Sequence, residues 1–272
     1  MIEKQTNSLP IWLFRNLGKY NEVCHFISTR IGGFSSPPFK ALNLGFHVGD
    51  NPEMVLKNRL LLSRVLGISP GSFTTVQQVH GHNVKIITEE LKGSGAVNHD
   101  PAISEADAMV TNVPDACLLV LQADCVPVLL FDPQKRVIGA AHAGWKGTIR
   151  LVAQRVVSEM QEKFGCLPQN IVVGIGPSIG PCCFEVGPEV IAQAKSIFRE
   201  KRGFISKETL DGKGYFNLWE ANKMQLIQMG IPVGNIEVAG TCTSCRHNIF
   251  FSARRQGRKT GRFGAGIMLK NL

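Results

Sequence analysis

Cys125 and His142 interrupt a stretch of branched aliphatic side chains, LQADCVPVLLFDPQKRVIGAAHAGWKGT, that runs from Leu121 to Thr148. A thiolate sulfur and an imidazole nitrogen are common ligands of zinc, and the same pair serves a cysteine nucleophile and its base. Either chemistry requires the two side chains to lie close together. The structural alternative is that Cys125 is a small buried apolar residue, as free cysteines usually are.

A β-hairpin would bring these two residues together. Apolar segments 116–131 and 136–143 flank the turn sequence DPQK, whose proline suits the second turn position. If the first and last residues of that turn pair, Cys125 pairs with His142, and their Cβ atoms lie roughly 5 Å apart. Pro127 indicates an edge or a bulge, which would shift this register by one residue.

A third ligand is needed for a catalytic zinc, which takes three protein ligands and keeps a fourth position open. His80 is the best candidate, because it ends an apolar segment within residues 73–88 and precedes Gly81, where the backbone can turn. His82 is the alternative, but it lies beyond the break and is expected to be exposed.

Other cysteines offer a competing site. Cys242 and Cys245 have the C-x-x-C spacing of a metal-binding hairpin, but the chain has no second such pair. Cys182 and Cys183 are adjacent, which we judge a poor geometry for two ligands of one tetrahedral ion. We therefore interpret these residues as loop thiols. Because no signal peptide or membrane span is recognisable, we expect reduced cysteines and a cytoplasmic protein.

The 272 residues are 44% hydrophobic, which suffices for one large core, and we expect a single domain over residues 1–272. Segments typical of strands and helices are mixed without strict alternation, and several strand pairs look like hairpins. This predicts an α+β layered fold instead of a doubly wound parallel sheet. Helices are expected over residues 50–67, with Asp50 as a cap, and over residues 148–164.

Positive charge is concentrated late in the chain. The net charge is +9, and no acidic residue follows Glu237. The basic tail after it contains Arg246, Arg254, Arg255, Arg258, Lys259, Arg262 and Lys270. This tail predicts either a site for an anion such as phosphate or a solvated basic surface. Binding of nucleic acid is not expected, because few aromatic residues interleave the basic ones.

A set of short motifs occurs in a fixed order along the chain. They are Thr29-Arg30-Ile31-Gly32-Gly33, Leu42-Asn43-Leu44-Gly45, Gln78-Val79-His80-Gly81, Ala123-Asp124-Cys125-Val126-Pro127, Ala141-His142-Ala143-Gly144-Trp145-Lys146-Gly147, Gly176-Pro177-Ser178-Ile179-Gly180 and Thr260-Gly261-Arg262. In combination they resemble the laccase-domain family, long labelled polyphenol oxidases or multicopper oxidases and later described as purine nucleoside phosphorylases. The resemblance extends from about Phe26 to Met268.

This resemblance implies a zinc ion held by His80, Cys125 and His142, with copper also implied as a possible metal. It implies an α+β fold with two mixed β-sheets between helical layers. The implied activity is phosphorolysis of adenosine, inosine and methylthioadenosine, with some adenosine deamination. The partners are then purine nucleosides and phosphate, without nucleic acid or membrane, and we expect a monomer or a small homo-oligomer.

Phosphorolysis requires a phosphate pocket and contacts to the nucleoside. Arg30, Arg59 and Arg262 are candidate phosphate ligands, because a guanidinium fork matches phosphate oxygens; the alternative for each is surface charge. Asn43 and Gln78 are candidates for binding the sugar hydroxyls or the base.

Asp124 and Cys125 are the candidate catalytic residues. Asp124 either accepts or relays a proton, or points away and orients a histidine ligand, and alternation along a strand favours the second role. Deamination fits the same metal, since zinc makes a bound water more acidic, but the usual zinc-deaminase signature is absent and Asp124 would be the nearest base.

Three other functions remain open. Cys125 could be the nucleophile of a metal-independent hydrolase or deamidase, with His80 or His142 as its base. A copper-dependent polyphenol oxidase is the weaker alternative, because seven histidines with a single His-x-His pair are too few for a full multicopper set. A binding module that uses the basic tail would show salt-dependent retention on nucleic acid.

Overall fold

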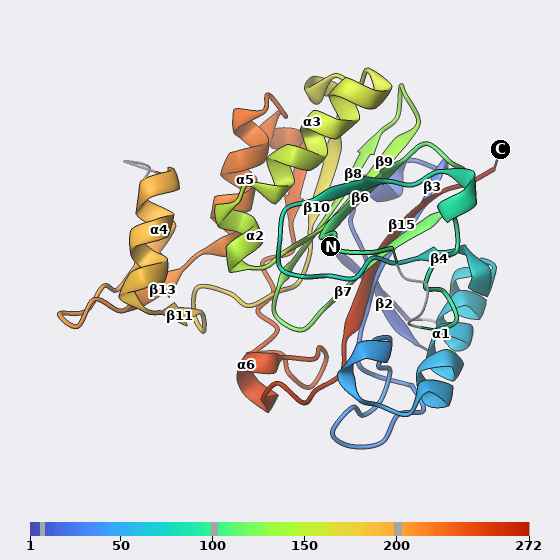
Figure 1. Cartoon of the computed structure of the whole chain (residues 1–272), viewed down its shortest axis with the longest axis horizontal. Coiled ribbons are helices and arrows are strands. Elements are labelled where there is room, and N and C mark those ends of the chain that lie inside the picture. The colour runs from blue at the N-terminus through green and yellow to red at the C-terminus, as the bar shows by residue number, and fades with distance from the viewer. Residues whose placement is uncertain (6–8, 99–102, 199–202, 272) are drawn as a thin grey trace.

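The computed structural model describes residues 1–5, 9–98, 103–198 and 203–271. One large β-sheet has the strand order β1-β2-β3-β15-β7-β4, and its neighbours are antiparallel except β4 and β7. Its strands are β1 (Ile2–Gln5), β2 (Pro10–Leu13), β3 (Val23–Ser28), β15 (Phe263–Leu269), β7 (Cys117–Gln122) and β4 (Phe73–Thr74). We call it the first sheet. The late strand β15 lies between the much earlier strands β3 and β7 (Figure 1).

The second sheet has the order β14-β10-β8-β9-β6-β5. Its strands are β14 (Ile236–Val238), β10 (Val172–Ile175), β8 (Val126–Asp132), β9 (Val137–Ala143), β6 (Ala108–Thr111) and β5 (Val84–Ile86). The pairs at its two edges, β10–β14 and β5–β6, are parallel, and the others are antiparallel. Both large sheets are therefore mixed.

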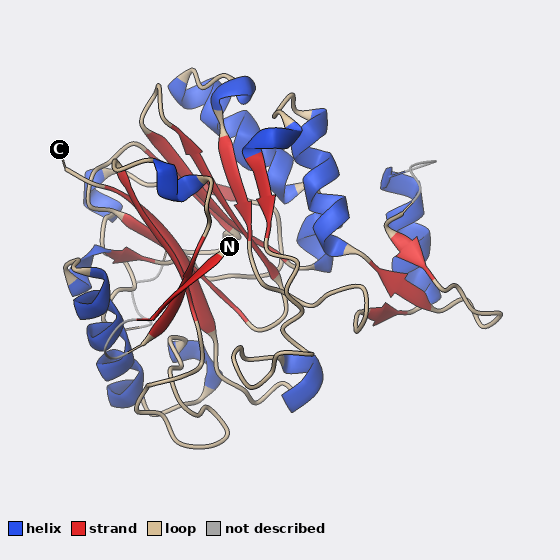
Figure 2. Cartoon of the chain, turned by 180° about the vertical axis from the view of Figure 1, so that it is seen from behind, coloured by secondary structure: helices blue, strands red, loops and turns tan. Residues whose placement is uncertain are grey.

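The two sheets pack face to face, and helices cover their outer faces (Figure 2). The strands of the second sheet are apolar on both faces, as β8 illustrates. Leu129 and Phe131 pack into the core between the sheets, while Val128 and Leu130 pack under the helices. The covering helices are α2 (Trp145–Ile149), α3 (Val152–Phe164) and α5 (Leu218–Gln228) over the second sheet, and α1 (Pro52–Leu66) beside the first. The predicted α+β layered fold, with two mixed sheets flanked by helices, is confirmed.

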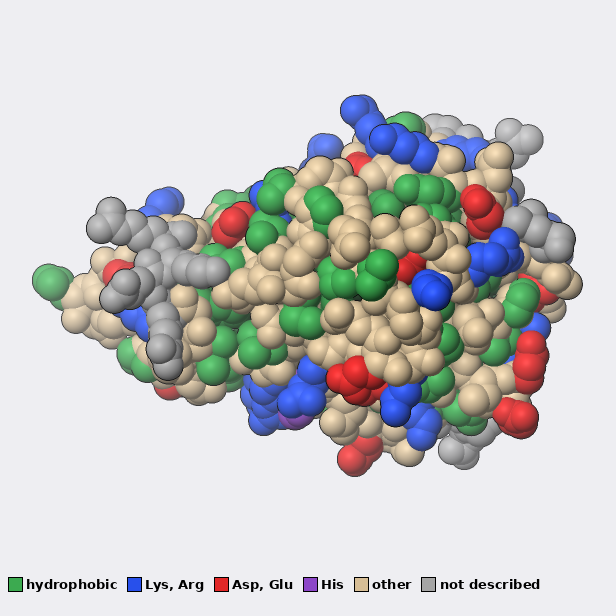
Figure 3. Space-filling view, turned by 90° about the horizontal axis from the view of Figure 1, so that it is seen from above, with side chains coloured by type: hydrophobic (Ala, Val, Ile, Leu, Met, Phe, Trp, Pro, Cys, Tyr) green, Lys and Arg blue, Asp and Glu red, His purple; other side chains and the backbone are tan. Residues whose placement is uncertain are grey.

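A small module projects from one side of these layers. It consists of β11 (Glu185–Val186), α4 (Pro188–Phe198), β12 (Ile205–Ser206) and β13 (Gly214–Phe216), and the strand order is β11-β13-β12. The module lies apart from the large sheets in Figures 1 and 2 and forms the narrow end of the molecule in Figure 3. Outside it, a short helix, α6 (Ala253–Gln256), lies in the loop before β15.

Short 3₁₀ helices connect the larger elements. They are η1 (Leu17–Lys19), η2 (Phe46–Val48), η3 (Pro70–Ser72), η4 (Glu89–Leu91), η5 (Pro168–Asn170) and η6 (Val233–Asn235). Among the described residues, no helix has the length and apolar character that a membrane crossing requires.

The hairpin formed by β8 and β9 exists, but its predicted register is wrong. Asp132 pairs with Val137, and His142 pairs with Pro127 instead of Cys125. The turn is longer than predicted, because the Asp132 carboxylate accepts hydrogen bonds from the backbone amides of Gln134 and Lys135. The register shifts by two residues, so each side chain keeps its predicted face.

The segment predicted as one strand over residues 116–131 is two strands in different sheets. β7 ends at Gln122 in the first sheet, and β8 begins at Val126 in the second. The chain changes sheet over the three residues between them, where Asp124 has a φ of 90°. Apolar residues are frequent on both sides of this bend, so the sequence pattern did not reveal that the chain passes from one sheet to the other.

Two helix predictions need correction at their boundaries. The helix predicted over residues 50–67 is α1, but the cap is Asn51, whose side chain accepts a hydrogen bond from the amide of Glu53. The helix predicted over residues 148–164 is divided into α2 and α3, because Leu151 adopts a left-handed conformation with a φ of 62°.

His25 on β3 is buried and neutral. Its Nε2 lies 2.9 Å from the backbone nitrogen of Phe14 and accepts a hydrogen bond from that amide. Burial lowers the pKa of His25 to about 4, although Glu237 and the Phe14 carbonyl act in the opposite direction. Between about pH 6.5 and pH 4, His25 is therefore protonated in the unfolded chain but neutral in the folded chain.

We expect acid to destabilise the fold through this residue. The free energy of unfolding should fall as the pH drops from about 6.5 towards 4, and His25 should account for at most about 3 kcal/mol of that loss. The His25→Gln variant keeps an acceptor for the Phe14 amide but does not titrate. Urea unfolding at neutral and acidic pH should show a smaller acid loss in the variant; parallel pH profiles would contradict the assignment.

Candidate functional site

His80, Cys125 and His142 meet where the two large sheets pack together. One ligand atom of each residue lies within 4.8 Å of those of the other two. The rings of His80 and His142 lie edge to face, with centroids 5.0 Å apart. The three residues come from the loop between β4 and β5, the bend before β8, and β9. The structure thus brings together the three residues that the sequence analysis selected as ligands.

Backbone geometry makes this meeting possible. His142 is on β9, and alternation with Ile138 and Ala140 directs it towards the first sheet. His80 itself has a positive φ of 58°, which turns the loop back at that point. At Gly144, a Cβ atom would lie 3.0 Å from the sulfur of Cys125 and 3.1 Å from the ring of His80, so a larger residue there would crowd the cluster.

The Asp107 carboxylate organises two of these residues. Its Oδ1 accepts a hydrogen bond from His142 Nδ1 at 2.9 Å, which directs Nε2 of that ring towards the cluster. The same carboxylate accepts hydrogen bonds from the backbone amides of Val79, His80 and Gly81, so it also fixes the loop that carries His80. The side chain is fully buried.

The cluster stabilises a thiolate. Burial raises the pKa of Cys125, but His142 and His80 outweigh burial and bring that pKa to about 6. Burial also lowers the pKa of His142, but the Cys125 thiolate and Asp107 outweigh it and raise the pKa to about 9. Cys125 is therefore a thiolate near neutral pH. That form is the one that binds a metal and the one that acts as a nucleophile.

The cluster opens into a cavity of about 610 Å³. Arg254, Arg258 and Arg262 of the basic tail line it, together with the aromatic side chains of Trp145 and Phe184. Burial lowers the pKa of Arg262, opposed by the nearby Cys125 and Asp124. The cavity thus joins soft metal ligands, positive charge and aromatic surface, which suits a planar apolar group attached to an anionic one.

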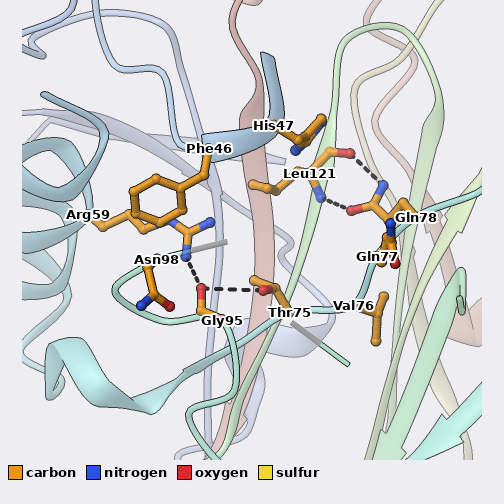
Figure 4. A pocket seen from close by; sticks show the side chains of 10 residues that line it. All are labelled: Phe46, His47, Arg59, Thr75, Val76, Gln77, Gln78, Gly95, Asn98 and Leu121. Carbon is orange, nitrogen blue, oxygen red and sulfur yellow. Dashed lines mark hydrogen bonds between the residues drawn. The ribbon is translucent and has the colours of Figure 1, made fainter. Parts of the chain in front are cut away.

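A smaller pocket of about 160 Å³ adjoins this cavity (Figure 4). His47, Gln78 and Leu121 line both spaces. The amide of Gln78 is fixed by two hydrogen bonds with the backbone of Leu121, one from its Nε2 to the carbonyl and one to its Oε1 from the amide. Gln78 is therefore held in a fixed orientation in the wall that the two spaces share.

Arg59 lines the smaller pocket and not the cavity beside the cluster. The residue is 2% exposed, and its guanidinium donates to the carbonyl oxygens of Leu44, Gly95 and Ala96. It also lies 4.5 Å from the ring centre of Phe46. Burial lowers its pKa to about 9. In this conformation Arg59 supports the pocket wall, and most of its donors are already used.

Arg30 and Asn43 are not among the residues that line the cavity. Arg30 donates to the carbonyl oxygens of Lys40 and His247 and thereby joins two loops. Asn43 is fully buried, and its side chain accepts hydrogen bonds from the amides of Gly45 and Arg262. Of the predicted phosphate and nucleoside ligands, Arg262 and Gln78 are the ones that the structure places beside the cluster.

Asp124 lines the cavity but contacts neither histidine ligand through a hydrogen bond. Its Oδ1 accepts a hydrogen bond from Thr243 Oγ1 at 2.6 Å, and its Oδ2 accepts one from the amide of Arg254 at 2.7 Å. Strand alternation, which favoured a histidine-orienting role, does not apply at the bend. Asp107 has that role, and the sequence analysis missed it. The available signal was an acid immediately before the apolar segment AMVT.

Residues 24–270 match the family model described as multi-copper polyphenol oxidoreductase laccase. The chain belongs to this laccase-domain family. A relative named purine nucleoside phosphorylase, from Bacteroides thetaiotaomicron, is 37% identical over 94% of this chain and 95% of its own length. Another, named adenosine deaminase RL5 and from an unknown prokaryotic organism, is 35% identical over 85% of this chain and 88% of its own.

Solved structures show the same laccase-domain fold. The crystal structure of Bacillus licheniformis hypothetical protein YfiH superposes with a TM-score of 0.93 at 34% sequence identity. The match covers 98% of this chain and 99% of that one. The similarity therefore extends over nearly the full length of both chains, including the two mixed sheets, the helical layers and the projecting module.

Replacing Asp107 by asparagine should weaken metal binding at this laccase-domain site. The amide lacks the charge that holds the His142 ring and the three loop amides, so we expect zinc affinity to fall by about 10–100-fold. Competition with a chromophoric chelator measures this. Glu105→Gln is the matched control, because this exposed acid lies two residues from Asp107 and outside the cluster, and zinc affinity should change little in that variant. An equal loss in both variants would exclude the orienting role.

Proposed function

We propose that this protein is a zinc-dependent purine nucleoside phosphorylase that acts on adenosine, inosine and methylthioadenosine, with adenosine deamination as a side reaction. The observation that carries the proposal is the His80, Cys125 and His142 cluster at the wall of a cavity lined by arginines. The name of the Bacteroides relative supports phosphorolysis, and that of the RL5 relative supports deamination.

The donor set fits zinc. Two imidazoles and one thiolate would supply three protein ligands, the number that a catalytic zinc takes, and the cluster faces a cavity that substrate could enter. The hydrogen bond from His142 to Asp107 is the usual support of such a ligand. Copper accepts the same ligands, so it is a possible metal here. When bound, the ion would supply Lewis acidity at the cavity wall.

Phosphorolysis breaks the bond between the sugar C1′ and the purine nitrogen and forms a bond from a phosphate oxygen to C1′. The guanidinium groups of Arg258 and Arg262 face the same cavity and suit the phosphate. Nη1 of Arg262 donates to the carbonyls of Thr260 and Gly261, which holds its planar group in place. Trp145 and Phe184 contribute aromatic surface to the cavity, against which a purine can pack.

The departing purine needs a proton, and the attacking hydrogenphosphate has one to give. Asp124 lines the cavity and remains our candidate for accepting that proton and relaying it to the purine. Its two hydrogen-bond donors, Thr243 and the amide of Arg254, hold the carboxylate in position. The same contacts make Asp124 a positioning residue for the arginine-bearing loop.

One observation favours a second function. The Cys125 thiolate and the protonated His142 form the ion pair that a cysteine hydrolase or deamidase uses without metal. Removal of metal separates the two functions. A phosphorylase that depends on zinc loses activity with a chelator and regains it with added zinc, whereas a cysteine hydrolase keeps its activity.

Incubation of the pure protein with adenosine, with and without phosphate, tests the proposal. Adenine that forms only with phosphate is the expected product, detected by chromatography. Cys125→Ser should remain folded by circular dichroism while losing the metal of the His80, Cys125 and His142 cluster and lowering phosphorolysis by more than about 100-fold. A Cys125→Ser protein that lacks this metal and keeps full turnover would exclude the proposed site.

Phosphate binding should depend on Arg258. This side chain is exposed at the cavity and makes no hydrogen bond to the described residues, so Arg258→Gln should spare the fold. We expect the KM for phosphate to rise by about 10-fold or more with little change in the KM for the nucleoside. Arg255→Gln is the control, because Arg255 is an exposed neighbour that does not line the cavity. Equal kinetics in the two variants would remove Arg258 from the phosphate site.

A further inference from the structure

Cys182, Cys183, Cys242 and Cys245 gather outside the site described above. Their sulfur atoms all lie within 4.8 Å of one another. The sulfur of Cys245 is 3.6 Å from that of Cys182 and 3.5 Å from that of Cys183. All four are free thiols, on two loops that are far apart in the sequence.

The backbone explains how adjacent cysteines reach one point. The amides of Cys183 and Phe184 both donate to the carbonyl of Gly180, which closes a tight turn around Cys182 and Cys183. A parallel bridge between Ser178 and Cys242 then aligns this turn with the second loop. The interpretation of these residues as loop thiols rested on the lack of a second C-x-x-C pair and on the adjacency of Cys182 and Cys183, and it did not anticipate this turn.

The second loop is shaped in the same way. The amide of Arg246 donates to the carbonyl of Cys242, so Cys242 and Cys245 lie on one turn. The amide of Gly180 donates to the sulfur of Cys242 at 3.2 Å. Hydrogen bonds from amides to sulfur stabilise a thiolate and are part of the surroundings of a metal ligand.

We propose that Cys182, Cys183, Cys242 and Cys245 bind one zinc ion in a tetrathiolate site that is separate from the His80, Cys125 and His142 cluster. Four sulfurs placed about 2.3 Å from a tetrahedral zinc ion stand about 3.8 Å apart, which agrees with the observed spacing. The four thiols release their protons when the ion binds. Since cysteine fills every position, the site is structural and has no open position for substrate.

Positive charge lies beside the cluster to balance the four thiolates. The Arg254 guanidinium donates to the carbonyl oxygens of Cys183 at 3.0 Å and Glu185 at 3.1 Å. Arg246 follows Cys245 directly and is exposed. The exposed positions of Cys182 and Cys245 give the ion a route from solvent, while the buried Cys242 anchors the site to the fold.

The ion would join two walls of the active cavity. The first loop carries Ile179 and Phe184 into the cavity lining and then enters β11 of the projecting module. The second loop carries Thr243, which binds Asp124, and leads to Arg254. Zinc at the four cysteines would therefore fix the loop that carries Phe184 and the loop that leads to Arg254 relative to each other.

Metal content tests the proposal. Protein purified in the presence of a reductant and without chelator should contain two zinc ions per chain by elemental analysis. Cys125→Ser should retain one, and the double variant Cys182→Ser with Cys245→Ser should also retain one. Cys24→Ser is the matched control and should retain two, because Cys24 lies on β3 outside both clusters.

Cobalt shows which ligands hold the remaining ion. Cys125→Ser protein, stripped and reloaded with Co²⁺, should show the strong sulfur-to-cobalt charge transfer of a tetrathiolate site. A second substitution of Cys182 and Cys245 in that background should abolish the signal. If the double variant fails to fold, the cobalt spectrum of the Cys125→Ser protein still decides.

Two outcomes would overturn the second site. One is a single zinc ion per wild-type chain that disappears in Cys125→Ser, with no cobalt signal in that variant. The other is thiol counting that finds these cysteines joined as disulfides in freshly prepared protein, which would indicate a redox pair. Because the proposed phosphorylase depends on the other cluster, either result leaves that proposal standing.

Discussion

The abrupt passage of the chain from one sheet to the other at Asp124 is the constraint on which the site depends. A non-glycine residue with a φ of 90° costs on the order of 1–3 kcal/mol, so the surrounding contacts must hold it there. The Asp124 carboxylate accepts hydrogen bonds from the Thr243 hydroxyl and the Arg254 amide. The backbone carbonyl of Asp124 accepts a hydrogen bond from the amide of Ile179. The bend thus places Cys125 beside His142 and anchors two cavity-lining loops at the same time.

Asp107 completes this arrangement from the opposite side. A fully buried carboxylate requires hydrogen bonds to offset its lost hydration, and here the donors are the ligand His142 and the amides around His80. One desolvated charge therefore connects the strand residue His142 to the loop that carries His80, and pairing of β5 with β6 supports the same loop from one end. The residues of the cluster are positioned by this buried charge as well as by the β-sheet.

Much of the fold followed from local patterns, and much of the site did not. The hairpin of β8 and β9, helix α1 and the layered class follow from periodicity and turn residues. The register failed because the side chain of Asp132 extends the turn, which the residue types alone do not determine. The ligand set nevertheless came together, because a shift of two residues preserves the face of His142. Asp107 was missed because its hydrogen-bond partners are distant in the sequence. Arg59 was selected as a phosphate ligand because of its charge, but backbone carbonyls surround its guanidinium.

The position of β15 in the middle of the first sheet affects how the protein folds during its synthesis. Its neighbours β3 and β7 precede it by a long stretch of chain, and until β15 arrives each of them has an unpaired edge within the first sheet. Pairings between such distant segments slow folding and expose strand edges to other molecules in the meantime. During synthesis the strands around the bend would leave the ribosome well before the strand that closes their sheet. During that interval the edges of β3 and β7 are open to pairing with strands of other molecules.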